Sequence, residues 1–259
     1  DYIDKYYTPF IPAAKRMNAK IKRDIDPINN DGITLIPQAM SIVADEVIDL
    51  HRQLVPYGYD EINVNLGCPS GTVVSKKRGS GILAYPDILD SFLDELYTKA
   101  DFPVSIKTRV GFNDDELWPR LIEIYSKYPI SELTVHPRVQ KDFYKNTPRM
   151  DDFALAMQKI NPDKTLCYNG DITDTNSFNA LTDCFPDIDE IMIGRGLFAN
   201  PALIAELKGI SMDKAELRER LKNWHDEILS GYLSIFSGEK DAMFRMKEIW
   251  AYMHGLFSD

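Results

Sequence analysis

The chain has 259 residues and a formal net charge of -10, and hydrophobic residues make up 44% of it. This length and composition allow one large α/β domain, or one such domain with a small appendage. The negative charge excludes a protein that binds nucleic acid through a generally basic surface, because phosphate binding rests on lysine and arginine. No run approaches the ~20 apolar residues of a membrane span, and no signal segment opens the chain, so we expect a cytoplasmic protein without a membrane partner.

Short β-branched runs recur along the chain, and each is followed by a helical stretch. The predicted strands cover residues 6–11, 33–38, 62–66, 104–109, 132–136, 165–169 and 190–193. Their starts lie about 25 to 40 residues apart, which is the length of a βα unit. Seven strands are one fewer than a closed barrel needs. We therefore predict an α/β fold, a (β/α)8 TIM barrel whose first strand is absent from this chain.

After Pro201 the pattern becomes purely helical. Apolar residues at helical spacing predict two amphipathic helices, which join near Ser237 and Gly238. We predict a barrel domain over residues 1–208 and a partial all-helical domain over residues 209–259.

The third predicted strand ends abruptly in a Gly67-Cys68-Pro69 turn, which lifts one thiol out at its end. The three cysteines form no metal-binding spacing and cannot all pair, which suits a reducing compartment. We expect no metal site, and we interpret Cys167 and Cys184 as small apolar fillers.

Polar residues also follow the other predicted strands. They are Gln38, Asn65 with Cys68, Lys107 with Arg109, His136 with Arg138, Asn169 with Asp171, and Gly194 with Arg195. In a (β/α)8 barrel the strand ends share the face that carries the active site. We therefore expect these side chains to converge there.

The segment 61–83 closely resembles the tRNA-dihydrouridine synthases, flavoenzymes that reduce a uridine in tRNA. The matching residues are Asn65, Cys68, Lys76, Gly79, Ser80 and Leu83. The segments 105–111, 136–138, 169–172 and 193–201 are similar to further elements of the same family. The resemblance spans nearly the whole chain. It also implies that about twenty residues with an initial strand precede this chain, and that the helical domain of the family is longer.

The resemblance implies an FMN site and a mechanism. The FMN-binding residues that it indicates are Gln38, Asn65, Lys107, His136, Asn169, Gly170, Asp171, Gly194 and Arg195. In that mechanism NADPH reduces FMN, the flavin N5 gives a hydride to C6 of a flipped-out uracil, and Cys68 gives a proton to C5. The turn offers no motif that would activate Cys68 as a nucleophile.

A tRNA partner must contact local basic patches. The expected RNA-binding residues are Lys76, Lys77, Arg78, Arg138, Arg245 and Lys247. We expect the protein to act as a monomer.

Two other readings remain open. A small-molecule FMN oxidoreductase of the dihydroorotate dehydrogenase type also uses a barrel and a cysteine at a strand end. The basic continuation after Cys68 and the helical tail favour tRNA. A non-catalytic RNA-binding or flavin-binding module is the third possibility.

Overall fold

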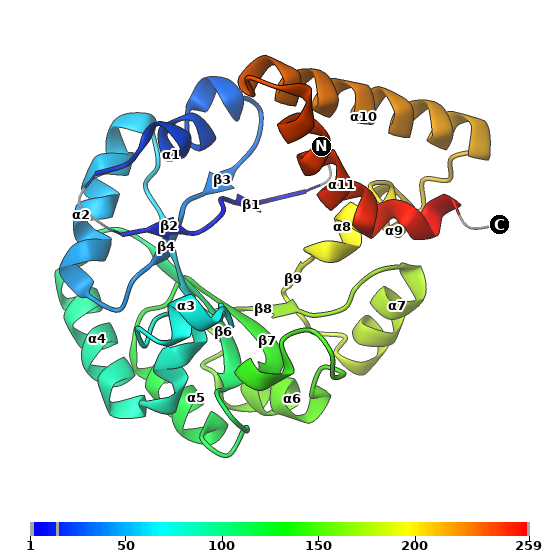
Figure 1. The fold of residues 1–259 in the computed structure, drawn as a ribbon. Coiled ribbons are helices and arrows are strands. Elements are labelled where there is room, and N and C mark those ends of the chain that lie inside the picture. Colours follow the sequence, from blue (N-terminus) through cyan, green and yellow to red (C-terminus); the bar gives the residue numbers. More distant parts are fainter. Residues whose placement is uncertain (1–2, 14–15, 258–259) are drawn as a thin grey trace. The chain divides into compact units, whose positions relative to one another are not determined.

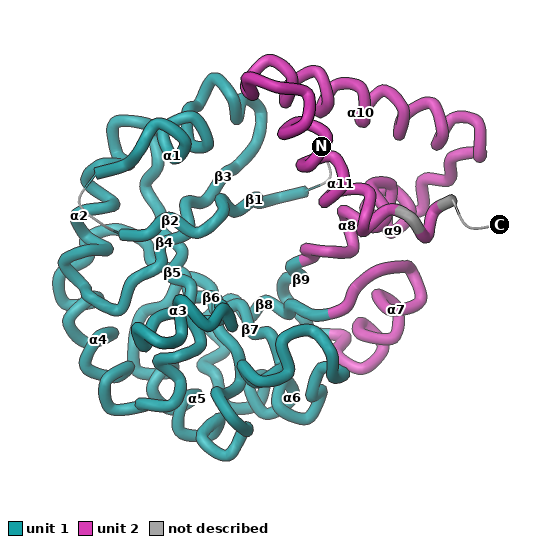
Figure 2. The backbone as a smooth tube through the Cα atoms, in the orientation of Figure 1, with its two compact units in different colours: residues 1, 3–170, 187–192 teal, residues 2, 171–186, 193–259 magenta. Residues whose placement is uncertain are grey.

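The computed structural model describes residues 3–13 and 16–257. The chain divides into two compact units, which Figure 2 distinguishes by colour. Unit 1 holds residues 3–170 and 187–192, and unit 2 holds residues 171–186 and 193–257. This division falls earlier in the chain than the predicted boundary at residue 208. The assignment of a catalytic and an RNA-binding domain therefore stays a prediction.

Unit 1 is built on a parallel sheet whose strands pair in the order in which they follow along the chain (Figure 1). The strands are β2 (Ile11–Pro12), β4 (Gln38–Met40), β5 (Ile62–Leu66), β6 (Val104–Gly111), β7 (Glu132–Val139), β8 (Thr165–Asn169) and β9 (Glu190–Met192). Consecutive parallel neighbours joined by helices are the arrangement of a (β/α)8 barrel. The predicted fold class is confirmed.

The first two predicted strands are each divided in two. β1 (Tyr6–Tyr7) and β3 (Leu35–Ile36) pair with each other as a short separate ribbon, and β2 and β4 follow them in the main sheet. Pro9 and Pro37 lie at the breaks, and proline has no N–H with which to continue a ladder. Gln38 therefore begins β4, and the prediction that it ends a strand is wrong.

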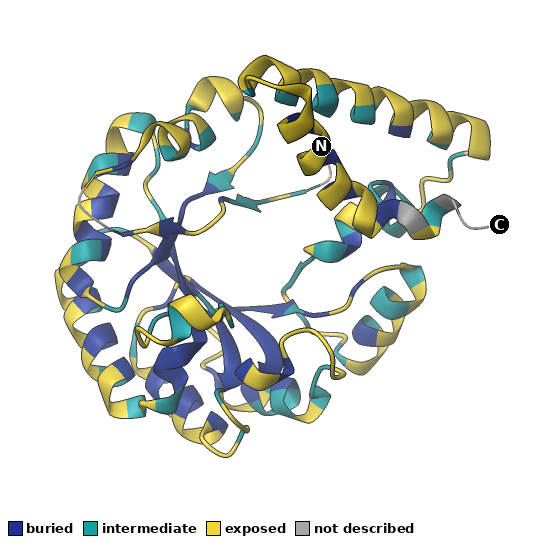
Figure 3. Ribbon diagram, in the orientation of Figure 1, coloured by how far each residue is buried: buried dark blue, intermediate teal, exposed yellow. Residues whose placement is uncertain are grey.

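The helices of unit 1 are α1 (Ala19–Asp24), α2 (Ala44–Leu54), α3 (Gly71–Val74), α4 (Pro86–Lys99), α5 (Trp118–Lys127) and α6 (Met150–Lys159). The one-turn helix α3 lies over the strands, and the longer helices lie along the outer side of the sheet (Figure 1). Short 3-10 helices are η1 (Pro27–Asn29), η2 (Val55–Tyr57), η3 (Gly79–Ala84) and η4 (Gln140–Asp142). In α5, Trp118, Leu121, Ile122 and Tyr125 are buried at helical spacing. Figure 3 shows β5 and β7 buried throughout, whereas the helices carry both buried and exposed residues.

Unit 2 is helical. It contains α7 (Thr175–Cys184), α8 (Arg195–Ala199), α9 (Leu203–Leu207), α10 (Lys214–Ile235), α11 (Glu239–Met253) and η5 (His254–Phe257). Asp213 caps α10, because its carboxylate accepts from the N–H groups of Ala215 and Glu216. Leu221 of α10 packs with Met246 and Ile249 of α11. The break at residues 236–238 confirms the two predicted amphipathic helices.

Every helix among the described residues is too short or too polar to span a lipid bilayer.

Candidate active site

Cys68 lies in a tightly held turn directly after β5. The side-chain Oδ1 of Asn65 accepts hydrogen bonds from the N–H groups of Gly67 (3.1 Å) and Cys68 (2.9 Å). Ser80 donates both its N–H (3.1 Å) and its Oγ–H (2.8 Å) to the carbonyl oxygen of Cys68. Gly79 has φ 55°, and a Cβ at this position would lie 2.7 Å from the same oxygen. The backbone of Cys68 is thus fixed on both sides, while its thiol stays partly exposed.

A chain of buried side chains continues from Asn65 into the sheet. Asn65 Nδ2 donates to Gln38 Oε1 (2.6 Å), and Gln38 Nε2 donates to Asn63 Oδ1 (2.8 Å). Asn63 Nδ2 then donates to Ser105 Oγ (3.1 Å). The structure therefore brings together Gln38 and Asn65, as expected. It also adds Asn63 and Ser105, which were not predicted. The two-residue spacing of Asn63 and Asn65 places these two on one face of a strand and was the available signal.

Lys107 lies beside Asn65, because the two residues are partners in the register of β5 and β6. Its Nζ donates to Asn169 Oδ1 (2.7 Å), and Asn169 Nδ2 donates to the carbonyl of Met192 (2.9 Å). Burial, with a smaller contribution from the charge of Arg109, lowers the pKa of Lys107 to about 8. Lys107 and Asn169, which were predicted separately, form one hydrogen-bonded pair.

His136 and Arg138 lie within β7, which runs to Val139 and is longer than predicted. Both side chains are buried, and Arg138 is only 1% exposed. The guanidinium of Arg138 contacts His136 Nε2 (3.1 Å) and donates to the carbonyl of Asn146. A side chain so fully enclosed offers no surface to a polyanion. The prediction that Arg138 binds RNA is therefore withdrawn.

The predicted phosphate-binding residues fall into the two units. In unit 1, Gly170 lies close to Tyr168, since an added Cβ would be 2.9 Å from the tyrosine hydroxyl. In unit 2, Asp171 has φ 38°, and its carboxylate accepts from the guanidinium of Arg195 (2.8 Å). Gly194 has open space where a side chain would stand. Arg195 therefore has a carboxylate partner, and a phosphate at this position would compete with Asp171 for the guanidinium of Arg195.

The remaining predicted RNA-binding residues lie on two separate segments. In unit 1, Lys76 and Lys77 are exposed, and the Lys77 ammonium lies 4.4 Å from the centre of the Tyr85 ring. Arg78 pairs with Glu46 (3.0 Å).

In unit 2, Arg245 pairs with Glu248 (3.0 Å), and the Lys247 ammonium lies 5.9 Å from the centre of the Phe244 ring. Both are exposed residues of α11. That the two segments contact one RNA stays a prediction.

An ionic cluster in unit 1 was not foreseen. Lys5 Nζ lies 2.8 Å from Glu132 and 3.2 Å from Glu190, and the hydroxyl of Tyr7 donates to Glu132 (3.0 Å). Ligand atoms of Glu132, Cys167 and Glu190 lie within 4.8 Å of one another, which is close enough for them to share a cation. The ammonium of Lys5 already supplies a cation there. Burial raises the pKa of Cys167 above its usual range.

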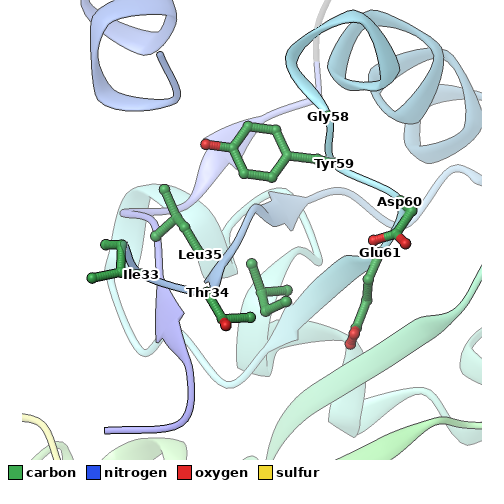
Figure 4. Close-up of a pocket in the computed structure, with 8 residues that line it drawn as sticks. Ile33, Thr34, Leu35, Gly58, Tyr59, Asp60 and Glu61 are labelled. Atoms are coloured by element: carbon green, nitrogen blue, oxygen red, sulfur yellow. The ribbon is translucent and has the colours of Figure 1, made fainter. Parts of the chain in front are cut away.

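A pocket among the described residues is lined by residues 33–36 and 58–61 (Figure 4). These residues precede β4 and β5, whereas Cys68 follows β5. The pocket is therefore not part of the candidate site.

Both the sequence and the fold of this chain are similar to those of known proteins. The family model described as "Dihydrouridine synthase (Dus)" matches residues 3–251. A probable tRNA-dihydrouridine synthase of Staphylococcus aureus is 31% identical over 202 residues, which cover 76% of this chain and 58% of that protein. The tRNA-dihydrouridine synthase B of Escherichia coli K12 is 31% identical over 173 residues, which cover 66% and 53%. The chain thus spans less than two thirds of the length of these relatives.

Among solved structures, dihydrodipicolinate synthase from Agrobacterium tumefaciens is similar with a TM-score of 0.47 and 17% identity, covering 90% of this chain and 80% of that one. The 3-hexulose-6-phosphate synthase from Salmonella typhimurium is similar with a TM-score of 0.49 and 14% identity, covering 81% and 86%.

Proposed function

Because this chain belongs to the dihydrouridine synthase family, we propose that it reduces uridine in tRNA to 5,6-dihydrouridine. The observation that carries the proposal is the Cys68 turn. A partly exposed thiol follows β5, its backbone is held by Asn65 and Ser80, and Asn65 is the register partner of Lys107. An acid and a cation on adjacent strands suit the reduction of a polarised double bond.

The side chains around this turn fit FMN, which when bound supplies a hydride after reduction by NADPH. Gln38, Asn65 and His136 offer amide and imidazole groups to a heterocyclic edge. Lys107 offers a cation, although burial disfavours the charged form of its ammonium and lowers its pKa. A negative charge beside it would raise its pKa again, so Lys107 and an anionic ring would stabilise each other.

The phosphate of FMN is assigned by family resemblance to Asn169, Gly170, Asp171, Gly194 and Arg195. The guanidinium of Arg195 can present two parallel donors to a phosphate.

Cys68 acts as the general acid that protonates C5 of the uracil. A thiol carries a proton, and the partly exposed side chain of Cys68 can deliver it to a base that enters the site. The substrate base must leave its stack to reach a buried site, as in other enzymes that act on bases.

The tRNA backbone is bound by few cations, namely Lys76, Lys77 and Arg78 after the catalytic turn, and Arg245 and Lys247 on α11. With a net charge of -10, few contacts imply a shallow salt dependence of binding. We further propose that the protein works as a monomer in the cytoplasm.

The test uses Cys68→Ala in the full-length protein, with Cys184→Ala as the matched control at an exposed cysteine. Loss of a positioned acid costs about 10²- to 10⁴-fold, so formation of dihydrouridine in tRNA should fall on that scale. Reduction of the flavin by NADPH should survive, since that step needs no proton from Cys68.

Two results would count against these assignments. Normal dihydrouridine formation by Cys68→Ala would remove Cys68 from the mechanism. A wild-type protein whose flavin is reduced by NADPH but which leaves tRNA uridine unchanged would favour the small-molecule oxidoreductase instead.

A further inference from the structure

The turn that carries Cys68 is also held from the far side, by β6 and by the segment that follows β7. Arg109 Nε donates to the carbonyl of Gly67 (2.9 Å), and Gln140 Nε2 donates to the carbonyl of Pro69 (2.9 Å). These two carbonyls belong to the residues immediately before and after Cys68.

The guanidinium of Arg109 joins this turn to a second piece of backbone. Its two terminal nitrogens donate to the carbonyls of Val139 (2.9 Å) and Phe143 (2.8 Å). Arg109 is 1% exposed, so these bonds form in an environment where an unpaired donor would be costly. A planar fork can serve three carbonyls at once, whereas a lysine ammonium cannot do so in the same geometry.

The position of the thiol follows from the position of this backbone. A cysteine side chain has one rotatable bond before its sulfur, and that bond has three staggered positions. With Asn65 and Ser80 holding the N–H and carbonyl of Cys68 itself, three successive residues of the turn are hydrogen-bonded. Any movement of the backbone of this turn would therefore displace the sulfur of Cys68 as well.

Building on the proposed function, we propose that Arg109 and Gln140 are positioning residues. Their hydrogen bonds to the carbonyls of Gly67 and Pro69 hold the Cys68 thiol in place for proton delivery to the substrate. Neither side chain needs to touch the substrate for this role. It makes the segment 139–143 a further support of the acid, in addition to Asn65 and Ser80.

The test measures the thiol directly, independently of any activity. Gln140→Leu keeps the approximate size and removes the donor. Gln53→Leu is the matched control, because Gln53 Nε2 donates to the carbonyl of Asp49 (3.2 Å) within α2, away from the turn. Alkylation of Cys68 by iodoacetamide is followed by peptide mass spectrometry in the full-length protein without tRNA. The exposed Cys184 serves as the internal standard.

Cys68 in Gln140→Leu should be alkylated about fivefold faster than in wild type, because losing a neutral hydrogen bond raises the population of looser conformations of the turn by about that factor. Gln53→Leu and the alkylation of Cys184 should match wild type. The uridine step from pre-reduced enzyme should slow in Gln140→Leu while flavin reduction keeps its rate.

An unchanged alkylation rate in folded Gln140→Leu, with wild type active on tRNA, overturns the positioning role. If Cys68 is alkylated faster in Gln140→Leu but the wild-type protein forms no dihydrouridine, the hydrogen bonds do hold the turn and the proposed function is wrong. Arg109→Lys provides the second variant, and it should accelerate alkylation by at least as much as Gln140→Leu.

Discussion

Replacing Lys107 by methionine should stabilise the flavin-free protein at neutral pH. The pKa of Lys107 is lowered from 10.5 to about 8 by burial. This difference corresponds to a cost of about 3 kcal/mol for keeping the ammonium charged in the folded state. The variant also loses the hydrogen bond from the Lys107 ammonium to Asn169, which is charge-assisted and worth about 2 kcal/mol. We therefore expect a net gain of about 1 kcal/mol in the free energy of unfolding.

The gain should depend on pH in a defined direction. Between pH 8 and 10.5 the unfolded chain binds more protons at Lys107 than the folded chain, so wild-type stability rises with pH through this window. The advantage of Lys107→Met is therefore complete below pH 8 and disappears toward pH 10.5.

Urea unfolding at pH 7 and at about pH 10 measures both effects. Lys20→Met, at an exposed lysine of α1, is the control and should change stability little at either pH. A Lys107→Met protein that is less stable than wild type at pH 7, or whose advantage is the same at both pH values, would refute the reasoning. The variant should also bind FMN more weakly, because the cation is lost.

Three further changes have expected outcomes. Arg195→Ala should weaken FMN binding by about 1.5 to 3 kcal/mol, measured by fluorescence titration, because a charge-assisted contact is lost; unchanged affinity would contradict the phosphate assignment. Charge reversal of Lys76 and Lys77 to glutamate should weaken tRNA binding and flatten its salt dependence in filter-binding assays, and intact binding would exclude this loop. Lys5→Met leaves the carboxylates of Glu132 and Glu190 without their cation. Because Glu132 is buried while Lys5 and Glu190 are partly exposed, the variant should lower the free energy of unfolding by about 2 kcal/mol at pH 7, and this loss should shrink on acidification as the carboxylates become protonated. If the free energy of unfolding that Lys5→Met loses is the same at all pH values, the ion pairs of Lys5 with Glu132 and Glu190 are not its cause.

The sequence was informative where a local pattern decides the structure. The strand before Cys68 and the turn after it follow from alternating apolar residues and a Gly-Cys-Pro segment, and both are present. The helices α10 and α11 follow from apolar spacing that the structure buries in one core. These features depend on neighbours within a few residues.

Features that depend on distant residues could not be predicted. Lys5 meets Glu132 and Glu190 across 127 and 185 residues of sequence. Arg138 carries a charge that suggested an RNA contact, but whether a cation faces solvent depends on which carbonyls and rings lie around it. The place of Gln38 at the start of β4 was also missed, although Pro37 gave a local signal.

The buried hydrogen-bonded chain of amide side chains beside the Cys68 turn has a direction. The backbone N–H groups of Gly67 and Cys68 can only donate, so Asn65 must present its oxygen to them and its NH2 group to Gln38. Gln38 must then turn its own NH2 group toward the next acceptor, and Asn63 must do the same toward Ser105.

Of the two orientations that such a chain could adopt, the backbone selects one. A carboxylate at any of the three amide positions would interrupt this order, because an ionised carboxylate only accepts hydrogen bonds and could not donate to the next residue of the chain. The hydroxyl of Ser105 on β6 therefore has to accept from Asn63, a role that is set by two peptide groups at the end of β5, one of which belongs to Cys68.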